Sequence, residues 1–294
     1  MVDEMRSNKI VPATLAPGIL IGTCLSTLGG GTVGRESGAL QMGASLSETL
    51  GRAFKLKSVF KDKQDAPLYG YAALVGMSAT FSALFFAPLG AVFMVLELTH
   101  YKNFSIPRLL ALVTASGIAA AITHAVGIGD IIPRVTVPAL SGDLALHVLL
   151  VGVVCGVLGS FLGNAMHLVR EWRQSHKPHP FIAVIIAGVI LAAVIYFFDM
   201  QAFEGSGANL LNAALSGHTG AFDFAIKAGL MFLTLSFGFK GGEVMPTFVV
   251  GGLLGCSLGQ IIGMDPAFLA AIGSIAFYVG FSRCPLAGFF IGIE

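Results

Sequence analysis

Apolar residues occur along this chain in long continuous runs, without the alternation of a β-strand. Seven long apolar segments contain no Asp, Glu, Lys or Arg: 10–34, 71–96, 109–129, 144–169, 181–198, 244–264 and 266–282. Most of them reach the roughly 18–20 residues that a helix needs to span a bilayer. The pattern predicts an all-α polytopic membrane protein of roughly ten to twelve helices, several of them too short to span. A β-barrel is excluded, because its strands would alternate.

Composition strengthens the membrane assignment. Hydrophobic residues make up 55% of the 294 and charged residues only 11%, whereas soluble domains carry about 25% charged residues. The formal net charge is +1 and there is no basic stripe, so a nucleic-acid partner is not expected. No nucleophile–base motif and no cysteine metal-site spacing occur, so an enzyme is not expected. We expect a multi-pass integral protein in the lipid bilayer of the cell membrane.

Polar connectors divide the apolar segments. They comprise a basic loop at 55–63, connectors at 100–108 and 130–143, and a fourth at 170–180 that contains the only tryptophan, Trp172. The first and the fourth carry Lys and Arg, which favours the cytoplasmic side for both. The number of crossings between them is open, and therefore so is the orientation of the chain.

The chain contains an internal repeat. Segments 76–97 and 273–294 both run from Gly to Pro in twelve positions and then to a Glu nine positions beyond the Pro. Upstream of them, GRESGALQMGASLSETLG at 34–51 is matched by GGEVMPTFVVGGLLGCSLG at 241–259. Such repeats are typical of transporters, whose site lies near the bilayer midplane where the repeats meet. The expected organisation is one transmembrane domain over 1–294, a first repeat half at 11–130 and a second at 144–294.

An ionisable pair lies deep in the first apolar region. Arg35 and Glu36 are the only charged residues between Lys9 and Glu48. Charged residues inside a membrane segment are functional-site candidates by default. Gly34 and Gly38 flank the pair, so a helix is expected to break before Arg35 and to resume after Gly38. The free N–H groups at the start of that helix, with Ser37 among them, would form an anion site.

The carboxylate of Glu36 is itself an anion that suits such a site. Ionised Glu36 would fill the site, and protonated Glu36 would leave it to a small anion, so proton and anion would compete. The alternative is a structural ion pair between Arg35 and Glu36 that caps the helix.

The second half contains a similar break. A glycine pair ending at Gly242 would terminate one helix, and Pro246 suits the first turn of the next. The N–H groups of Glu243, Val244 and Met245 would then face an anion, while the Glu243 side chain stabilises the helix N-terminus. Two opposed helix N-termini, one from each repeat, would hold a partly desolvated anion weakly enough to let it pass.

Two further features have structural interpretations. Glu97 and Glu294 end the repeated Pro-Leu segments, and a role in bonding backbone ends or a neighbouring subunit is favoured over a proton relay at Glu97. Glycines spaced four apart predict close helix packing. They are Gly152 and Gly156, and Gly251, Gly255 and Gly259.

These motifs together resemble the CLC family of chloride channels and anion/proton antiporters. GRESGALQMG resembles the family's GREGPxVQ-type motif, which puts Glu36 at the gating position, and GGEVMP resembles the second anion-binding loop. The Pro-Leu…Glu endings are similar too. The resemblance implies an inverted-repeat fold with broken and re-entrant helices, and a homodimer with one pore per subunit. It further implies chloride or fluoride and the proton as transported ions, with no metal or organic cofactor.

Within this family the motifs are most similar to the fluoride/proton antiporter branch. GFKGGEV and the run at 16–31 resemble that branch, and Leu98 stands where chloride antiporters have a second proton glutamate. Ser37 and Met245 depart from it, since glycine and threonine are usual there. The family has further helices on both sides, so the chain is expected to be partial. The alternative function is therefore a non-transporting remnant or a partner subunit.

Overall fold

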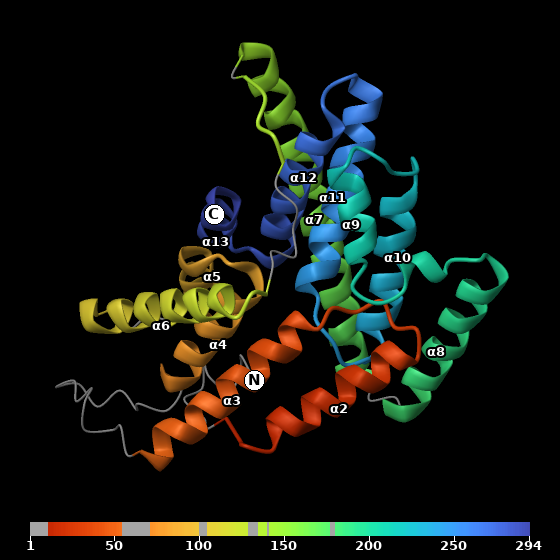
Figure 1. The fold of residues 1–294 in the computed structure, drawn as a ribbon. Helices are drawn as coiled ribbons and strands as arrows, with labels where there is room; N and C mark the ends of the chain where they lie inside the picture. The colour runs from red at the N-terminus through yellow and green to blue at the C-terminus, as the bar shows by residue number, and fades with distance from the viewer. Residues whose placement is uncertain (1–10, 55–70, 100–104, 129–134, 140, 177–179) are drawn as a thin grey trace. The chain divides into compact units, whose positions relative to one another are not determined.

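The computed structural model describes residues 11–54, 71–99, 105–128, 135–139, 141–176 and 180–294. This part of the chain is almost entirely helical (Figure 1). Its elements are α2 (Leu15–Leu28), α3 (Glu36–Ala53), α4 (Tyr71–Phe85), α5 (Pro88–Thr99), α6 (Ile106–Ala125), α7 (Gly142–His176), α8 (Pro180–Phe197), the 3-10 helix η2 (Gln201–Phe203), α9 (Ala208–Leu215), α10 (Asp223–Ser236), α11 (Val244–Ile262), α12 (Pro266–Ser282) and α13 (Pro285–Ile293).

The long apolar helices explain why this fold belongs in a bilayer. Among the described residues, α6, α7 and α11 are long and apolar enough to cross a membrane. Only 22% of the apolar window is buried in α6 and in α7, whereas 78% is buried in α11. Most apolar side chains on α6 and α7 therefore stay uncovered within the described structure, as expected where lipid or another protein surface covers them in a bilayer. The predicted all-α membrane architecture is confirmed.

The chain forms two compact units. One consists of 1–21, 38–131 and 286–294, and the other of 22–37 and 132–285. These units follow contacts in space and interleave along the sequence. The repeat halves at 11–130 and 144–294 follow the sequence motifs and stay a prediction.

The same backbone break occurs at matching places in the two repeats. Phe86 before α5 and Arg283 before α13 both adopt a left-handed conformation, with φ of 53° and 59°. Each lies two residues before the proline that opens the next helix, and proline fits the first helical turn because no N–H is needed there. Each break therefore ends one helix and starts a short one within an apolar stretch.

In the first unit, the two short helices cap each other. The Glu97 carboxylate at the end of α5 accepts the N–H groups of Leu286 and Ala287 at the start of α13, at 3.1 and 2.9 Å. Glu294 does the same at the start of α5, at 3.0 and 2.9 Å. A carboxylate placed on free helix N–H groups also offsets the helix dipole. The structural role expected of both glutamates is thus confirmed.

In the second unit, α7, α11 and α12 lie side by side (Figure 1). Glycines allow this closeness: a side chain at Gly251 would collide with the Gly273 backbone, and one at Gly255 with Leu269. The helix-packing prediction holds for the stripe on α11. It is wrong for Gly152, which has open space beside it. The packed apolar core comprises Val151, Cys155, Val250, Leu254, Leu269 and Phe277.

Helix α7 corrects one sequence interpretation. Residues 170–176, predicted as part of a connector, continue α7 as a helix to His176. Its 35 residues correspond to about 50 Å at 1.5 Å per residue, well beyond the roughly 30 Å hydrocarbon core. The polar end is helical because Arg170 and Arg173 find partners on neighbouring segments, as described below.

Candidate functional site

A short antiparallel bridge joins the two glycine motifs within the second unit. The Gly34 N–H donates to the Gly242 carbonyl at 2.8 Å, and the Gly242 N–H donates to the Gly34 carbonyl at 2.6 Å. The close approach of the backbone requires glycine at position 242 and leaves little space for a side chain at position 34. A side chain at Gly242 would lie 2.8 Å from the backbone nitrogen of Ser37. One at Gly34 would collide with the Glu36 carboxylate and lie 3.1 Å from Pro246.

The bridge brings two helix starts together. Helix α3 begins at Glu36, not after Gly38 as expected, so Gly38 lies within its first turn. Helix α11 begins at Val244. In the described part of the chain, no acceptor meets the backbone N–H groups of Ser37, Val244 and Met245. Unpaired amides at a helix start, reinforced by the helix dipole, form the donor set that suits a small anion.

Glu36 lies at this meeting point. Its side chain is 4% exposed, and its Oε2 atom is buried with no hydrogen-bond partner among the described residues. The favourable groups around it are the backbone N–H groups of Glu36 and Arg35 and, at longer range, the Arg35 guanidinium. A buried carboxylate with an unsatisfied oxygen is costly. The carboxylate therefore has little to hold it in place beyond these amides.

The alternative of a capping ion pair is not formed. Arg35 is exposed, and the ion pairs among the described residues do not include one between Arg35 and Glu36. Ser37 is half-buried, with its backbone nitrogen against Gly242. Arg35 thus contributes its backbone amide, and its guanidinium acts on the Glu36 carboxylate only at longer range.

The second motif differs from its prediction in one side chain. Glu243 occupies the N-cap position of α11 but makes no side-chain cap hydrogen bond. Its carboxylate instead pairs with Arg170 of α7 at 3.0 Å. Arg173, one turn further along α7, donates to the Ser236 carbonyl at the end of α10 at 2.7 Å. Sequence reasoning missed both arginines because it assigned their segment to a connector.

Met245 completes the second motif. It is 2% exposed, so an apolar side chain fills the place where a threonine hydroxyl would add a donor. The second motif therefore contributes only backbone N–H groups to the proposed set of anion donors. Among the described residues, no group of three His, Cys, Asp or Glu side chains is placed to hold a metal ion.

The starts of α3 and α11 meet at the glycine bridge inside an all-α fold with membrane-length helices. This arrangement defines the class of the protein as an integral membrane protein with paired helix starts at its candidate site. The family follows from comparison with known proteins. The chain matches the model of the voltage gated chloride channel family over residues 2–294, and it belongs to that family. The resemblance found in the sequence motifs is thereby confirmed.

Two bacterial relatives have assigned activities. The chain is 27% identical over 308 aligned residues to a chloride/fluoride channel protein of Pseudomonas syringae pv. tomato, with 100% of this chain and 65% of the relative covered. It is 25% identical to the H⁺/Cl⁻ exchange transporter ClcA of Vibrio cholerae, with 92% of this chain and 60% of that protein covered. The chain thus spans less than two thirds of the length of either relative.

Solved structures show the same fold. A CLC-type fluoride/proton antiporter superposes with a TM-score of 0.84 at 28% identity, over 95% of this chain and 69% of that one. A slow cyanobacterial Cl⁻/H⁺ antiporter superposes with a TM-score of 0.70 at 18% identity, over 94% of this chain and 72% of that one. The second likeness supports the fold alone.

Proposed function

We propose that this protein moves a small halide, chloride or fluoride, across the membrane in a process coupled to protons. The observation that carries the proposal is the Gly34–Gly242 bridge, which brings two helix starts together beside the buried carboxylate of Glu36. The relatives support the same class of activity, since one is a chloride/fluoride channel and another an H⁺/Cl⁻ exchanger. The likeness to a fluoride/proton antiporter supports fluoride as the first anion to test.

The proposed anion site consists of backbone donors. The N–H groups of Ser37, Val244 and Met245 would hold the halide, with Gly34 and Gly242 fixing the approach of the two helix starts. Such a site stabilises a desolvated anion through dipoles and carries no full positive charge of its own. Binding then stays weak enough to allow release.

Glu36 is the proposed gate. The ionised carboxylate competes with the halide for the same amides, because both are anions. Protonation removes this competition and lets the side chain leave the donors. One site occupied alternately by the carboxylate and by the halide would link proton uptake to anion movement. The unpaired Oε2 atom supports this, because no hydrogen bond from the described residues holds that oxygen in place.

Flux measurements test the proposal directly. The purified protein is placed in liposomes loaded with fluoride or with chloride, and anion efflux and proton uptake are recorded together. We expect Glu36→Gln to abolish proton uptake while anion efflux continues. The matched control is Glu171→Gln, which makes the same change on an exposed part of α7 and should behave like the wild type. Proton-coupled flux that persists in Glu36→Gln would refute the gate.

The remaining assignments belong to this same proposal. The lipid host is proposed to be the cell membrane, and the assembly a homodimer with one pore in each subunit. If neither halide leaves the liposomes, the non-transporting alternative, a remnant or a partner subunit, is favoured instead.

A further inference from the structure

A lysine is buried in the middle of the second unit. Lys227 on α10 is 0% exposed, and its ammonium donates to the backbone carbonyls of Phe203 at 2.8 Å and Gly205 at 3.0 Å. No carboxylate in the described part of the chain forms an ion pair with it. Burying an ammonium costs a great deal of solvation free energy. A buried ammonium that is held at this cost in free energy is therefore a candidate for a specific role in the protein.

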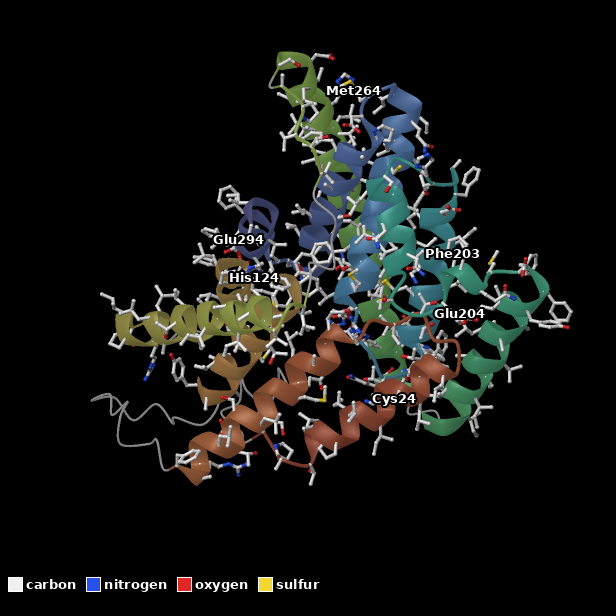
Figure 2. The ribbon with its side chains drawn as sticks, viewed as in Figure 1. Cys24, His124, Phe203, Glu204, Met264 and Glu294 are labelled. Carbon is white, nitrogen blue, oxygen red and sulfur yellow. The ribbon has the colours of Figure 1, made fainter. Side chains whose placement is uncertain are left out.

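The two carbonyls belong to the segment that joins α8 to α9, where Figure 2 shows Phe203 and Glu204. This segment also holds the chain just before the candidate site. The Phe203 carbonyl accepts a second hydrogen bond, from the Thr32 hydroxyl at 3.2 Å, and the Gly205 N–H donates to the Gly31 carbonyl at 3.2 Å. Charged donors polarise a shared acceptor and strengthen the network around it.

The same helix anchors Thr32 a second time. The Thr32 N–H donates to the hydroxyl of Thr234 at 3.3 Å, and Thr234 lies on α10 two turns beyond Lys227. From Thr32 the chain needs only two residues to reach Gly34, which pairs with Gly242. Hydrogen bonds thus connect the buried Lys227 ammonium to Thr32, and two residues of the chain connect Thr32 to the glycine bridge.

We infer that Lys227 is a positioning residue for the anion site. Its ammonium holds the 203–205 segment against residues 31 and 32, and that contact keeps Gly34 in register with Gly242. The consequence for anion binding rests on the proposed function. The effect of Lys227 on the Gly34–Gly242 register does not depend on the proposed function.

Hydrogen exchange of the purified wild-type protein and its variants tests this role. We expect Lys227→Met to raise exchange about tenfold in peptides that contain the Gly34 and Gly242 amides, because a hydrogen bond from a charged donor is lost. Exchange in α7 and α12 should not change. Lys227→Arg keeps the charge and the donors and should restore protection at least in part.

A second variant keeps the test decisive if Lys227→Met does not fold. Thr32→Val removes the hydroxyl that shares the Phe203 carbonyl and leaves Lys227 in place, so exchange at the Gly34 amide should rise in the same way. Thr27→Val is the matched control, because the Thr27 hydroxyl bonds only within its own helix, to Thr23. Unchanged exchange at Gly34 in Thr32→Val, or a rise spread equally over α7 and α12, would overturn the inference.

Flux separates this inference from the proposed function. In active protein, Lys227→Met and Thr32→Val should each weaken the apparent halide affinity about tenfold while changing the maximal rate much less. Absence of halide flux in the wild type would refute the proposed function but leave the exchange result to decide the role of Lys227. Normal halide affinity in both variants would refute the link from Lys227 to the site.

Discussion

The substitution Gly242→Ala tests whether the two helix starts must touch. A methyl group at this position would lie 2.8 Å from the Ser37 nitrogen and 3.1 Å from the Gly34 carbonyl oxygen. Ordinary van der Waals contact begins at 3.4 Å, and both neighbours are backbone atoms that cannot rotate away. The two segments must therefore separate.

Separation acts on both hydrogen bonds of the bridge, now 2.6 and 2.8 Å long. Overpacking of this kind costs about 1–3 kcal/mol. At about 2–4 °C per kcal/mol for a domain slightly smaller than this chain, the melting temperature should fall by about 2–12 °C. Halide flux should fall as well, because the amides of α3 and α11 no longer converge on one ion.

The assay is thermal unfolding in detergent, followed by flux in liposomes. Gly229→Ala is the control: it lies on α10 in the same unit, and nothing lies within 4 Å of the added methyl group. A helical Gly→Ala change with free space is favourable by roughly 0.5–1 kcal/mol, so this variant should melt at the wild-type temperature or above. If Gly242→Ala is as stable and as active as Gly229→Ala, the convergence of the two helix starts is refuted.

Three further outcomes follow from particular contacts. Halide efflux should rise as pH falls, because protonation frees the site from the Glu36 carboxylate, and the rate in Glu36→Gln should not vary with pH; a pH series of liposome flux checks both. Glu97→Gln and Glu294→Gln should each cost about 0.5–2 kcal/mol, because each carboxylate receives two N–H groups at a helix start; an unchanged melting temperature in both variants would contradict the reciprocal capping. Arg170→Met should cost less than about 1 kcal/mol, since the Arg170 and Glu243 side chains are 42% and 39% exposed. The effect should shrink at high salt. A large, salt-independent loss of melting temperature would contradict the assignment of this contact as a weak, solvent-exposed ion pair.

Local chemistry allowed much of the fold to be predicted. Prolines and glycines mark the helix starts, so the bounds of α5, which begins at Pro88, follow from the sequence alone. The start of α3 was predicted after Gly38, three residues too late, because Gly38 suggests a break. A glycine in a first helical turn is tolerated when other contacts, here the Gly34–Gly242 bridge, fix the chain just before it.

Long-range partners were beyond reach of the sequence pattern. Polarity made 170–176 look like a connector, but Arg170 and Arg173 stay helical because the Glu243 carboxylate and the Ser236 carbonyl accept hydrogen bonds from their guanidinium groups. Lys227 could have been identified as a candidate from the sequence, because it is a single charged residue in an apolar run, as Arg35 and Glu36 are charged residues in another. Which carbonyls would receive its ammonium depends on how distant segments pack, and no local pattern encodes that.

Halide binding to the purified protein tests the central claim most directly. Isothermal titration calorimetry with fluoride and with chloride would compare the wild type with Glu36→Gln at neutral pH. If the Glu36 carboxylate occupies the amides that receive the ion, removing its charge removes a competitor, and at least one halide should bind about tenfold or more tightly, a change of about 1.4 kcal/mol. Equal affinity of both proteins for both halides would contradict the account.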